Sequence, residues 1–222
     1  MLLAIDSATQ KIGIALYDGA QVHNEAVWHS QNHHSVELAP AIKSAVEQAG
    51  LDFTDIEVVA VSLGPGSYTG LRIGMSVAKG IALAKNLPLI GVSTFDILAE
   101  AQTLETDKQL AVVLEAGRKR LSVGWYKVID GAWKVFQDPD LLTPQELSQK
   151  IHTPTLICGE ILTETQRVLT RKWKNVTLIS PAFSLRRPSF LAEIAWKRWK
   201  AGDVDDPASL DPFYMQTDTS YL

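Results

Sequence analysis

The sequence predicts an α/β protein made of two similar lobes, and a repeated pattern is the main reason. Apolar segments with the length of strands alternate with segments that have helical spacing along the whole chain. An apolar strand ends in an acid twice, at Asp6 and at Glu115, and an Asp-Gly hairpin signal follows at a similar distance each time, at residues 18–19 and 130–131.

A duplicated β-β-β-α unit explains this recurrence; the alternative is a chance likeness between two hairpins. We expect residues 1–105 to form the N-terminal lobe and residues 106–222 to form the C-terminal lobe. The last helix or the tail is a candidate to pack back on the N-terminal lobe. Two such lobes face a cleft, and the acid from each first strand then lies near it.

The elements of the N-terminal half follow from local signals. A helix with Ser35 as its candidate N-cap ends at Gly50, with a kink at Pro40. A second helix follows the glycine loop at residues 64–70. Strands are expected at residues 2–6, in the two halves of 11–28, and at 56–63 and 87–92.

The C-terminal half follows in the same way, after a third helix that Ser93 or Thr94 caps. Thr143 caps a further helix and places Pro144 in its first position. Strands are expected at residues 110–115, on both sides of the second hairpin, and at 153–159 and 175–180, with helices at 164–170 and 189–201.

Composition limits the class of protein. A chain of 222 residues with 46% hydrophobic residues buries a core without disulfides or metals. The net charge of −4 argues against a broad nucleic-acid surface. The single cysteine, Cys158, lies in an apolar run and is expected to be buried and inert. Asp6 comes too early for a signal peptide, and no run approaches ~18 apolar residues, so we expect a cytoplasmic protein that crosses no membrane.

The glycine loop resembles a phosphate-binding loop only weakly. Its Gly64, Gly66 and Gly70 are spaced one residue wider than the dinucleotide fingerprint, and Leu71-Arg72 replaces the Lys-Ser/Thr of a Walker loop. Pro65 also removes an N–H donor. We interpret the loop as a tight turn from strand to helix, with direct phosphate binding as the alternative.

The helix after the loop carries small residues at Gly70, Gly74, Ala78 and Ala82, which share one face. Glycine inside a helix costs about 0.8–1 kcal/mol relative to alanine, and close approach of another backbone usually offsets that cost. This backbone belongs either to the chain's own sheet or to another protein. Because the helix has little polar surface, a second apolar face would mark a partner site.

The two acids stand where two-lobed phosphotransferases hold a metal-nucleotide. The turn at residues 118–120, Arg-Lys-Arg, is too bulky for a phosphate-binding turn and argues against a working ATP cleft. Asp6, Ser7, Thr9 and Arg118 stay candidates for weak anion or nucleotide binding.

Other candidate sites are weaker. His29 and His33 have the spacing of a helical zinc site, but they straddle a strand end and a loop and lack a third ligand, so no metal is expected. Ser67 lacks the surroundings of a catalytic serine. The segment from residue 186 to 202 interleaves basic residues with Trp196 and Trp199, which fits either RNA contact or simple packing.

These motifs together resemble those of a known family. The sequences "LAIDSA", "HHSVELAP", "SLGPGSYTGLRIGMSVAKGIA", "GVSTFDILA" and "DPFYMQ" are similar to motifs of the bacterial tRNA threonylcarbamoyladenosine biosynthesis protein family TsaB, the YeaZ type. The resemblance is dense over the first hundred residues and thinner afterwards. Met215 and Gln216 depart from it, as does "EAGRKRLSVGWY", where the family commonly has D-A-R-R-x-E-V-Y.

The resemblance implies a fold of the actin, Hsp70 and sugar-kinase (ASKHA) class, a duplicated ribonuclease-H-like architecture. It implies a non-catalytic subunit that pairs with a TsaD-type subunit, and the TsaD-type subunit transfers the threonylcarbamoyl group to tRNA. A TsaE-type ATPase joins this pair. Alone, such a protein forms homodimers through the same surface, and its tRNA contact is indirect or weak. No cofactor is expected, and a nucleotide at the partner interface is left open as an alternative. The implied partner face consists of Gly70, Leu71, Arg72, Gly74, Met75, Val77, Ala78, Ile81 and Ala82.

Three other functions stay open at this stage. One is an ASKHA-type phosphotransferase or ATPase that uses Asp6. Another is a glycoprotease, which would need a zinc site. The third is a tRNA-binding module built on the tryptophan-rich helix.

Overall fold

The computed structural model describes residues 1–31, 33–172 and 174–215, which form two compact units. The first unit comprises Met1–Ile97 and Arg186–Phe213, and the second comprises Leu98–Leu185 and the segment that starts at Tyr214. The first unit thus ends at Ile97 before the chain enters the second unit, whereas the sequence analysis places the lobe boundary at residue 105. The last helix belongs to the first unit.

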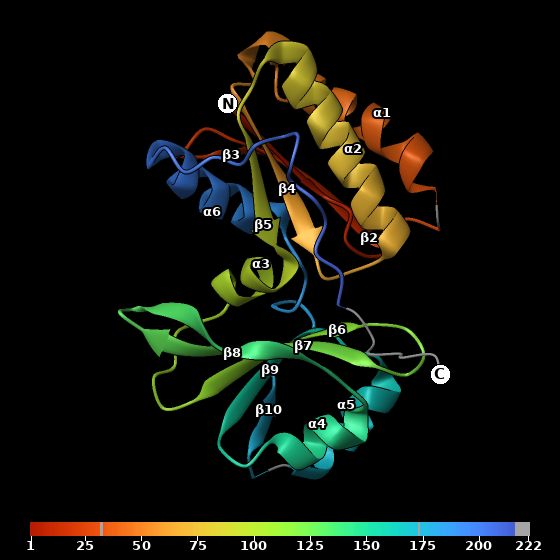
Figure 1. The fold of residues 1–222 in the computed structure, drawn as a ribbon, viewed down its shortest axis with the longest axis vertical. Helices are drawn as coiled ribbons and strands as arrows, with labels where there is room; N and C mark the ends of the chain where they lie inside the picture. Colours follow the sequence, from red (N-terminus) through yellow and green to blue (C-terminus); the bar gives the residue numbers. More distant parts are fainter. Residues whose placement is uncertain (32, 173, 216–222) are drawn as a thin grey trace. The chain divides into compact units, whose positions relative to one another are not determined.

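The first unit is built on a five-stranded sheet in the order β3-β2-β1-β4-β5 (Figure 1). The first three strands are an antiparallel meander, and β4 and β5 run parallel to β1. Helices α1 and α2 cover one face of this sheet, and α6 covers the other. The elements are β1 (Leu2–Asp6), β2 (Lys11–Tyr17), β3 (Val22–His29), α1 (His34–Gln48), η1 (Phe53–Asp55), β4 (Val58–Gly64), α2 (Tyr68–Lys85), β5 (Leu89–Ser93), α3 (Thr94–Glu100) and α6 (Pro188–Lys200).

Strand β1 is buried on both faces, because its side chains alternate between two apolar clusters. Leu3 and Ile5 pack with residues of α1 and α2. Leu2 and Ala4 pack on the opposite face with residues of α6. The uninterrupted apolar run at the start of the chain therefore follows from its position in the middle of a covered sheet.

The second unit repeats this topology. Its sheet has the order β10-β9-β6-β7-β8, with an antiparallel meander followed by two parallel strands, as in the first unit. Asp6 ends β1 and Glu115 ends β6, so the predicted duplication is confirmed. The elements are β6 (Gln109–Glu115), β7 (Leu121–Ile129), β8 (Ala132–Leu142), α4 (Pro144–Lys150), β9 (Thr155–Glu160), α5 (Thr163–Leu169), η2 (Thr170–Lys172) and β10 (Val176–Leu178).

The N-terminal ends of two helices test the capping residues that were predicted from the sequence. Thr143 caps α4 as predicted, with Pro144 in the first turn and Glu146 completing a capping box. The predicted cap of α1 is wrong: α1 begins at His34, so Ser35 lies inside the helix, and the N-cap residue His33 makes no side-chain cap bond. Within the residues that the structure describes, no helix combines the length and apolarity needed to cross a membrane.

Candidate functional site

The glycine loop between β4 and α2 is filled by the chain itself. A Cβ atom at Gly64 would overlap the Phe213 carbonyl oxygen, and one at Gly66 would overlap the Ala8 carbonyl oxygen. The Ser67 amide, which could have faced a phosphate, donates to the same Ala8 oxygen at 2.6 Å. The loop is therefore a tight turn packed on backbone, as interpreted from the sequence.

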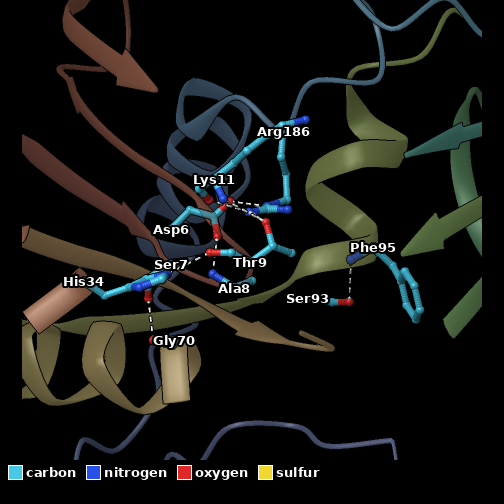
Figure 2. A network of polar contacts seen from close by, with 10 residues as sticks. All are labelled: Asp6, Ser7, Ala8, Thr9, Lys11, His34, Gly70, Ser93, Phe95 and Arg186. Carbon is cyan, nitrogen blue, oxygen red and sulfur yellow. Dashed lines mark hydrogen bonds and ion pairs between the residues drawn. The ribbon is translucent and has the colours of Figure 1, made fainter. Parts of the chain in front are cut away.

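The small residues of α2 approach the chain's own first strand. Cβ atoms added to Gly70 and Gly74 would overlap the Ser7 carbonyl oxygen and the Ser7 hydroxyl oxygen, respectively. The Ser7 hydroxyl donates to the Gly70 carbonyl at 2.8 Å (Figure 2). Ala78 and Ala82 are buried farther along the same face. The backbone whose approach offsets the glycine cost is thus the protein's own.

This packing bears on the implied partner face, because six of its nine residues are buried within the first unit. They are Gly70, Leu71, Gly74, Met75, Ala78 and Ala82. Arg72 is exposed, and Val77 and Ile81 are half-buried at the edges of the helix.

The outer face of α2, defined by Arg72, Ser76, Gly80 and Ala84, is exposed and has the same spacing of four residues. A Cβ at Gly80 would meet no atom within 4 Å. The sequence analysis chose the stripe of Gly70, Gly74, Ala78 and Ala82 because two sets of small residues share this spacing, although the implied partner face also included Arg72 from the outer set.

Two large side chains flank the outer face. Tyr68 is 55% exposed at the start of α2 and Leu83 is 68% exposed near its end. The Arg72 guanidinium lies 4.2 Å from the centre of the Tyr68 ring, a cation–π contact. The outer face therefore combines a small, smooth centre with an aromatic and cationic end and an aliphatic end.

The C-terminal segment runs beside α2 and β5 in the first unit (Figure 1). The Asp205 amide donates to the Leu89 carbonyl at 2.9 Å. Farther along, the Phe213 amide donates to the Leu63 carbonyl at 2.7 Å. This segment therefore bonds β5 at Leu89 and the end of β4 at Leu63, and it contacts α2 through the ion pair of Asp211 with Lys79. Arg72, Ser76, Gly80 and Ala84 of α2 remain exposed.

Asp6 is buried and neutralised by an arginine (Figure 2). Its carboxylate forms an ion pair with the Nε group of Arg186, and each residue is at most 2% exposed. The other Asp6 oxygen accepts the Ala8 amide at 3.0 Å. Arg186 also donates to the Thr9 hydroxyl at 3.2 Å and to the Lys11 carbonyl at 2.9 Å.

Three of the candidate cleft residues, Asp6, Ser7 and Thr9, thus lie on one network in the first unit, and their cation is Arg186. Sequence reasoning missed this partner because it lies 180 residues away along the chain. Arg118 belongs to the second unit, where it is exposed and has a positive φ of 49°. Within the second unit, Glu115 accepts from the Leu162 amide and the Thr165 hydroxyl, at the start of α5.

The histidine pair is not a helical pair. His29 ends β3, and His33 precedes α1 and lies 3.9 Å from Glu37. His34 is buried and bonds the Thr9 carbonyl at 2.9 Å. In the part of the chain that the structure describes, no three His, Cys, Asp or Glu side chains form a group that could hold a metal ion.

The tryptophan-rich helix α6 uses its aromatic residues in packing. The rings of Trp196 and Trp199 meet edge to face at 5.0 Å, and Tyr17 meets Trp196 at 5.6 Å. Lys200 lies over both tryptophan rings. Two arginines are also engaged: Arg187, the N-cap residue before α6, with Glu25, and Arg198 within α6 with Asp203 and Asp205.

Comparisons with known proteins identify relatives over most of the chain. A profile of the family described as "TsaD: tRNA N6-adenosine threonylcarbamoyltransferase" matches residues 27–184. The tRNA threonylcarbamoyladenosine biosynthesis protein TsaB of Bacillus subtilis (strain 168) is 33% identical over 161 residues, which cover 71% of this chain and 70% of that protein.

Two solved structures share the fold. A Pseudomonas aeruginosa protein with similarity to the peptidase YeaZ has a TM-score of 0.77 at 21% identity, covering 97% of this chain and 99% of that one. The activator of 2-hydroxyisocaproyl-CoA dehydratase from Clostridium difficile, with bound ADPNP, has a TM-score of 0.50 at 9% identity, covering 92% and 98%. The predicted two-lobed fold of the actin, Hsp70 and sugar-kinase class is thus confirmed. On the family profile and the Bacillus subtilis relative together, the chain belongs to the TsaB family, the YeaZ type, within the wider TsaD family.

Proposed function

We propose that this chain acts in the cytoplasm as a non-catalytic subunit in the formation of threonylcarbamoyladenosine in tRNA. It pairs with a TsaD-type catalytic subunit through the outer face of α2, and the pair recruits a TsaE-type ATPase. In the absence of that subunit, two copies of the chain pair through the same face. Contact with tRNA is indirect, and the chain supplies no cofactor site of its own.

The outer face of α2 is the observation that carries this proposal. Its centre is exposed at Ser76 and Gly80, and neither residue has a side chain larger than that of serine. Such a smooth surface allows the backbone of a partner helix to approach closely. The exposed ring of Tyr68 and the exposed Leu83 supply apolar area at its two ends.

The state of Asp6 supports a non-catalytic role. A carboxylate that binds a metal-nucleotide needs access to solvent and a free negative charge. Asp6 has neither, because it is 1% exposed and paired with Arg186. An active phosphotransferase, the alternative, would have to break this buried ion pair.

Co-purification with the TsaD-type subunit of the same cell tests the proposal. Gly80→Arg places a charged side chain in the centre of the outer face, at a position where its Cβ would meet no atom of the fold within 4 Å, so the monomer should fold and the pair should be lost. Gln149→Arg adds the same charge to an exposed position of α4 and is the matched control.

The outcomes separate the proposal from its alternative. Loss of the pair in Gly80→Arg alone, with no ATP turnover by the isolated chain, supports the proposal. A pair that tolerates Gly80→Arg would contradict the assigned face. ATP hydrolysis by the isolated chain that disappears in Asp6→Asn would favour the phosphotransferase.

A further inference from the structure

A series of buried and part-buried contacts links Arg186 to the turn between β1 and β2. Arg186 is 2% exposed and reaches three groups of this turn: the Asp6 carboxylate, the Thr9 hydroxyl and the Lys11 carbonyl. The Asp6 carboxylate also accepts the Ala8 amide. One guanidinium with its planar set of donors thus fixes both ends of the turn.

The same turn holds the start of α2. The Ser7 hydroxyl donates to the Gly70 carbonyl at 2.8 Å, and the Ala8 carbonyl accepts the Ser67 amide at 2.6 Å. Gly66 and Gly70 have no room for a Cβ on the side that faces the turn. The first turn of α2 therefore cannot shift unless residues 7 and 8 shift with it.

The outer face of α2 begins at this point. Tyr68 and Arg72, which form its aromatic and cationic end, lie on either side of Gly70 in the sequence. On the other side of the network, Arg186 leads into α6, whose Pro188 lies against Gly13 of β2. The position of Arg186 is therefore fixed by the sheet that α2 packs on.

We propose that Arg186 is a positioning residue for assembly: through Asp6 and the turn at residues 7–9, it fixes the first turn of α2 and with it the Tyr68 and Arg72 end of the partner face. This inference rests on the proposed function. On this inference, Asp6 at the end of β1 helps to position the partner face of α2 and does not hold a metal-nucleotide. This role also accounts for an arginine kept in a fully buried position.

A test must separate positioning from general stability. Arg186→Met alone leaves Asp6 buried without a counter-ion and can prevent folding. The double variant Asp6→Asn with Arg186→Met removes both charges, and Ser7→Ala removes only the bond to Gly70. Ile90→Val is the control, because Ile90 is fully buried on the α6 face of the same sheet, away from α2.

Two measurements on the full chain decide the question. The first is amide hydrogen exchange of the isolated chain at two positions: Ser67, whose amide donates to the Ala8 carbonyl, and Leu71, whose amide donates to the Ser67 carbonyl and closes the first turn of α2. The second is the dissociation constant for the TsaD-type subunit. We expect both Ser7→Ala and the double variant to exchange faster at these amides and to bind about five- to twenty-fold more weakly, whereas Ile90→Val changes neither.

Unchanged exchange in the variants, or a loss of affinity no larger than that of Ile90→Val at equal unfolding stability, would overturn the inference. If the double variant does not fold, Ser7→Ala still tests the required step from the turn at residues 7–9 to the first turn of α2, and unchanged exchange and affinity in that variant would overturn the inference. A wild-type chain that does not bind the TsaD-type subunit would instead refute the proposed function, and the assembly role of Arg186 with it. The exchange data would then still show whether Arg186 holds the start of α2.

Discussion

Gly70 lies directly against the carbonyl oxygen of Ser7, so a Cβ atom on Gly70 would overlap that oxygen. The overlap is with backbone, which cannot rotate away as a side chain can. Gly70→Ala should therefore lower the free energy of unfolding by about 1–3 kcal/mol. Urea unfolding monitored by circular dichroism measures the change.

Substitution of Gly80 in the same helix should have the opposite effect on the free energy of unfolding. A Cβ there meets no atom within 4 Å, and the position is exposed in a helix interior. Gly80→Ala should raise the free energy of unfolding by about 0.5–1 kcal/mol, because alanine loses less conformational freedom on folding. Equal effects of the two substitutions on unfolding would contradict the assignment of inner and outer faces.

Ser62 carries a buried hydroxyl with no hydrogen-bond partner among the described residues. Replacing such a group with an apolar one of similar shape removes an unpaired dipole. Ser62→Ala should therefore be neutral or stabilise the protein by up to about 1 kcal/mol, whereas Ser7→Ala, which loses a bond to Gly70, should cost about 0.5–1.5 kcal/mol. A larger loss for Ser62→Ala than for Ser7→Ala in urea titrations would refute this account.

Glu25 should contribute to the loss of stability of the first unit at low pH. Burial alone would raise the pKa of Glu25, but hydrogen bonds from Arg187 and Ser189 outweigh it and hold the pKa below its ordinary value of 4.5. A lowered pKa in the folded state contributes stability that is present above pH 4.5 and is lost as the pH falls through the folded pKa. In Glu25→Gln, the difference in unfolding free energy between pH 7 and pH 3 should be smaller than in the wild type.

Cys158 should report on unfolding of the second unit. The thiol is fully buried in β9, and burial raises its pKa to about 12. A thiol-specific reagent at pH 8 should therefore react only when this strand opens. Labelling that is fast in water and independent of urea would mean that Cys158 is accessible in the folded protein.

The helices, the strands and the duplicated unit could be predicted from the sequence, because local residue patterns determine each of them. Buried strands such as Leu2–Asp6 are uninterrupted apolar runs, and the Asp-Gly hairpins mark the turns. The cap of α1 was misplaced because Ser35 is a good capping residue that the structure does not use. A preference of one residue is weak when tertiary packing determines where a helix starts.

The candidate site was harder to predict for a physical reason. Two stripes of small residues run along α2 with the same spacing, and only the packing of the helix on β1 determines which one faces outward. The partner of Asp6 could not be found from spacing either, since Arg186 reaches it from a distant part of the chain. Local signals identified the helix and the acid, and tertiary contacts determined what each one packs against.

Accessibility of a single thiol tests the central claim most directly. Cys158 is buried, so Ser76→Cys would place the only accessible thiol in the centre of the outer face, and Gln149→Cys would place one on α4 as a control. The claim predicts that a maleimide labels both variants in the dilute isolated chain, and that the TsaD-type subunit protects only the thiol at position 76. Equal labelling of position 76 with and without a bound TsaD-type subunit would contradict it.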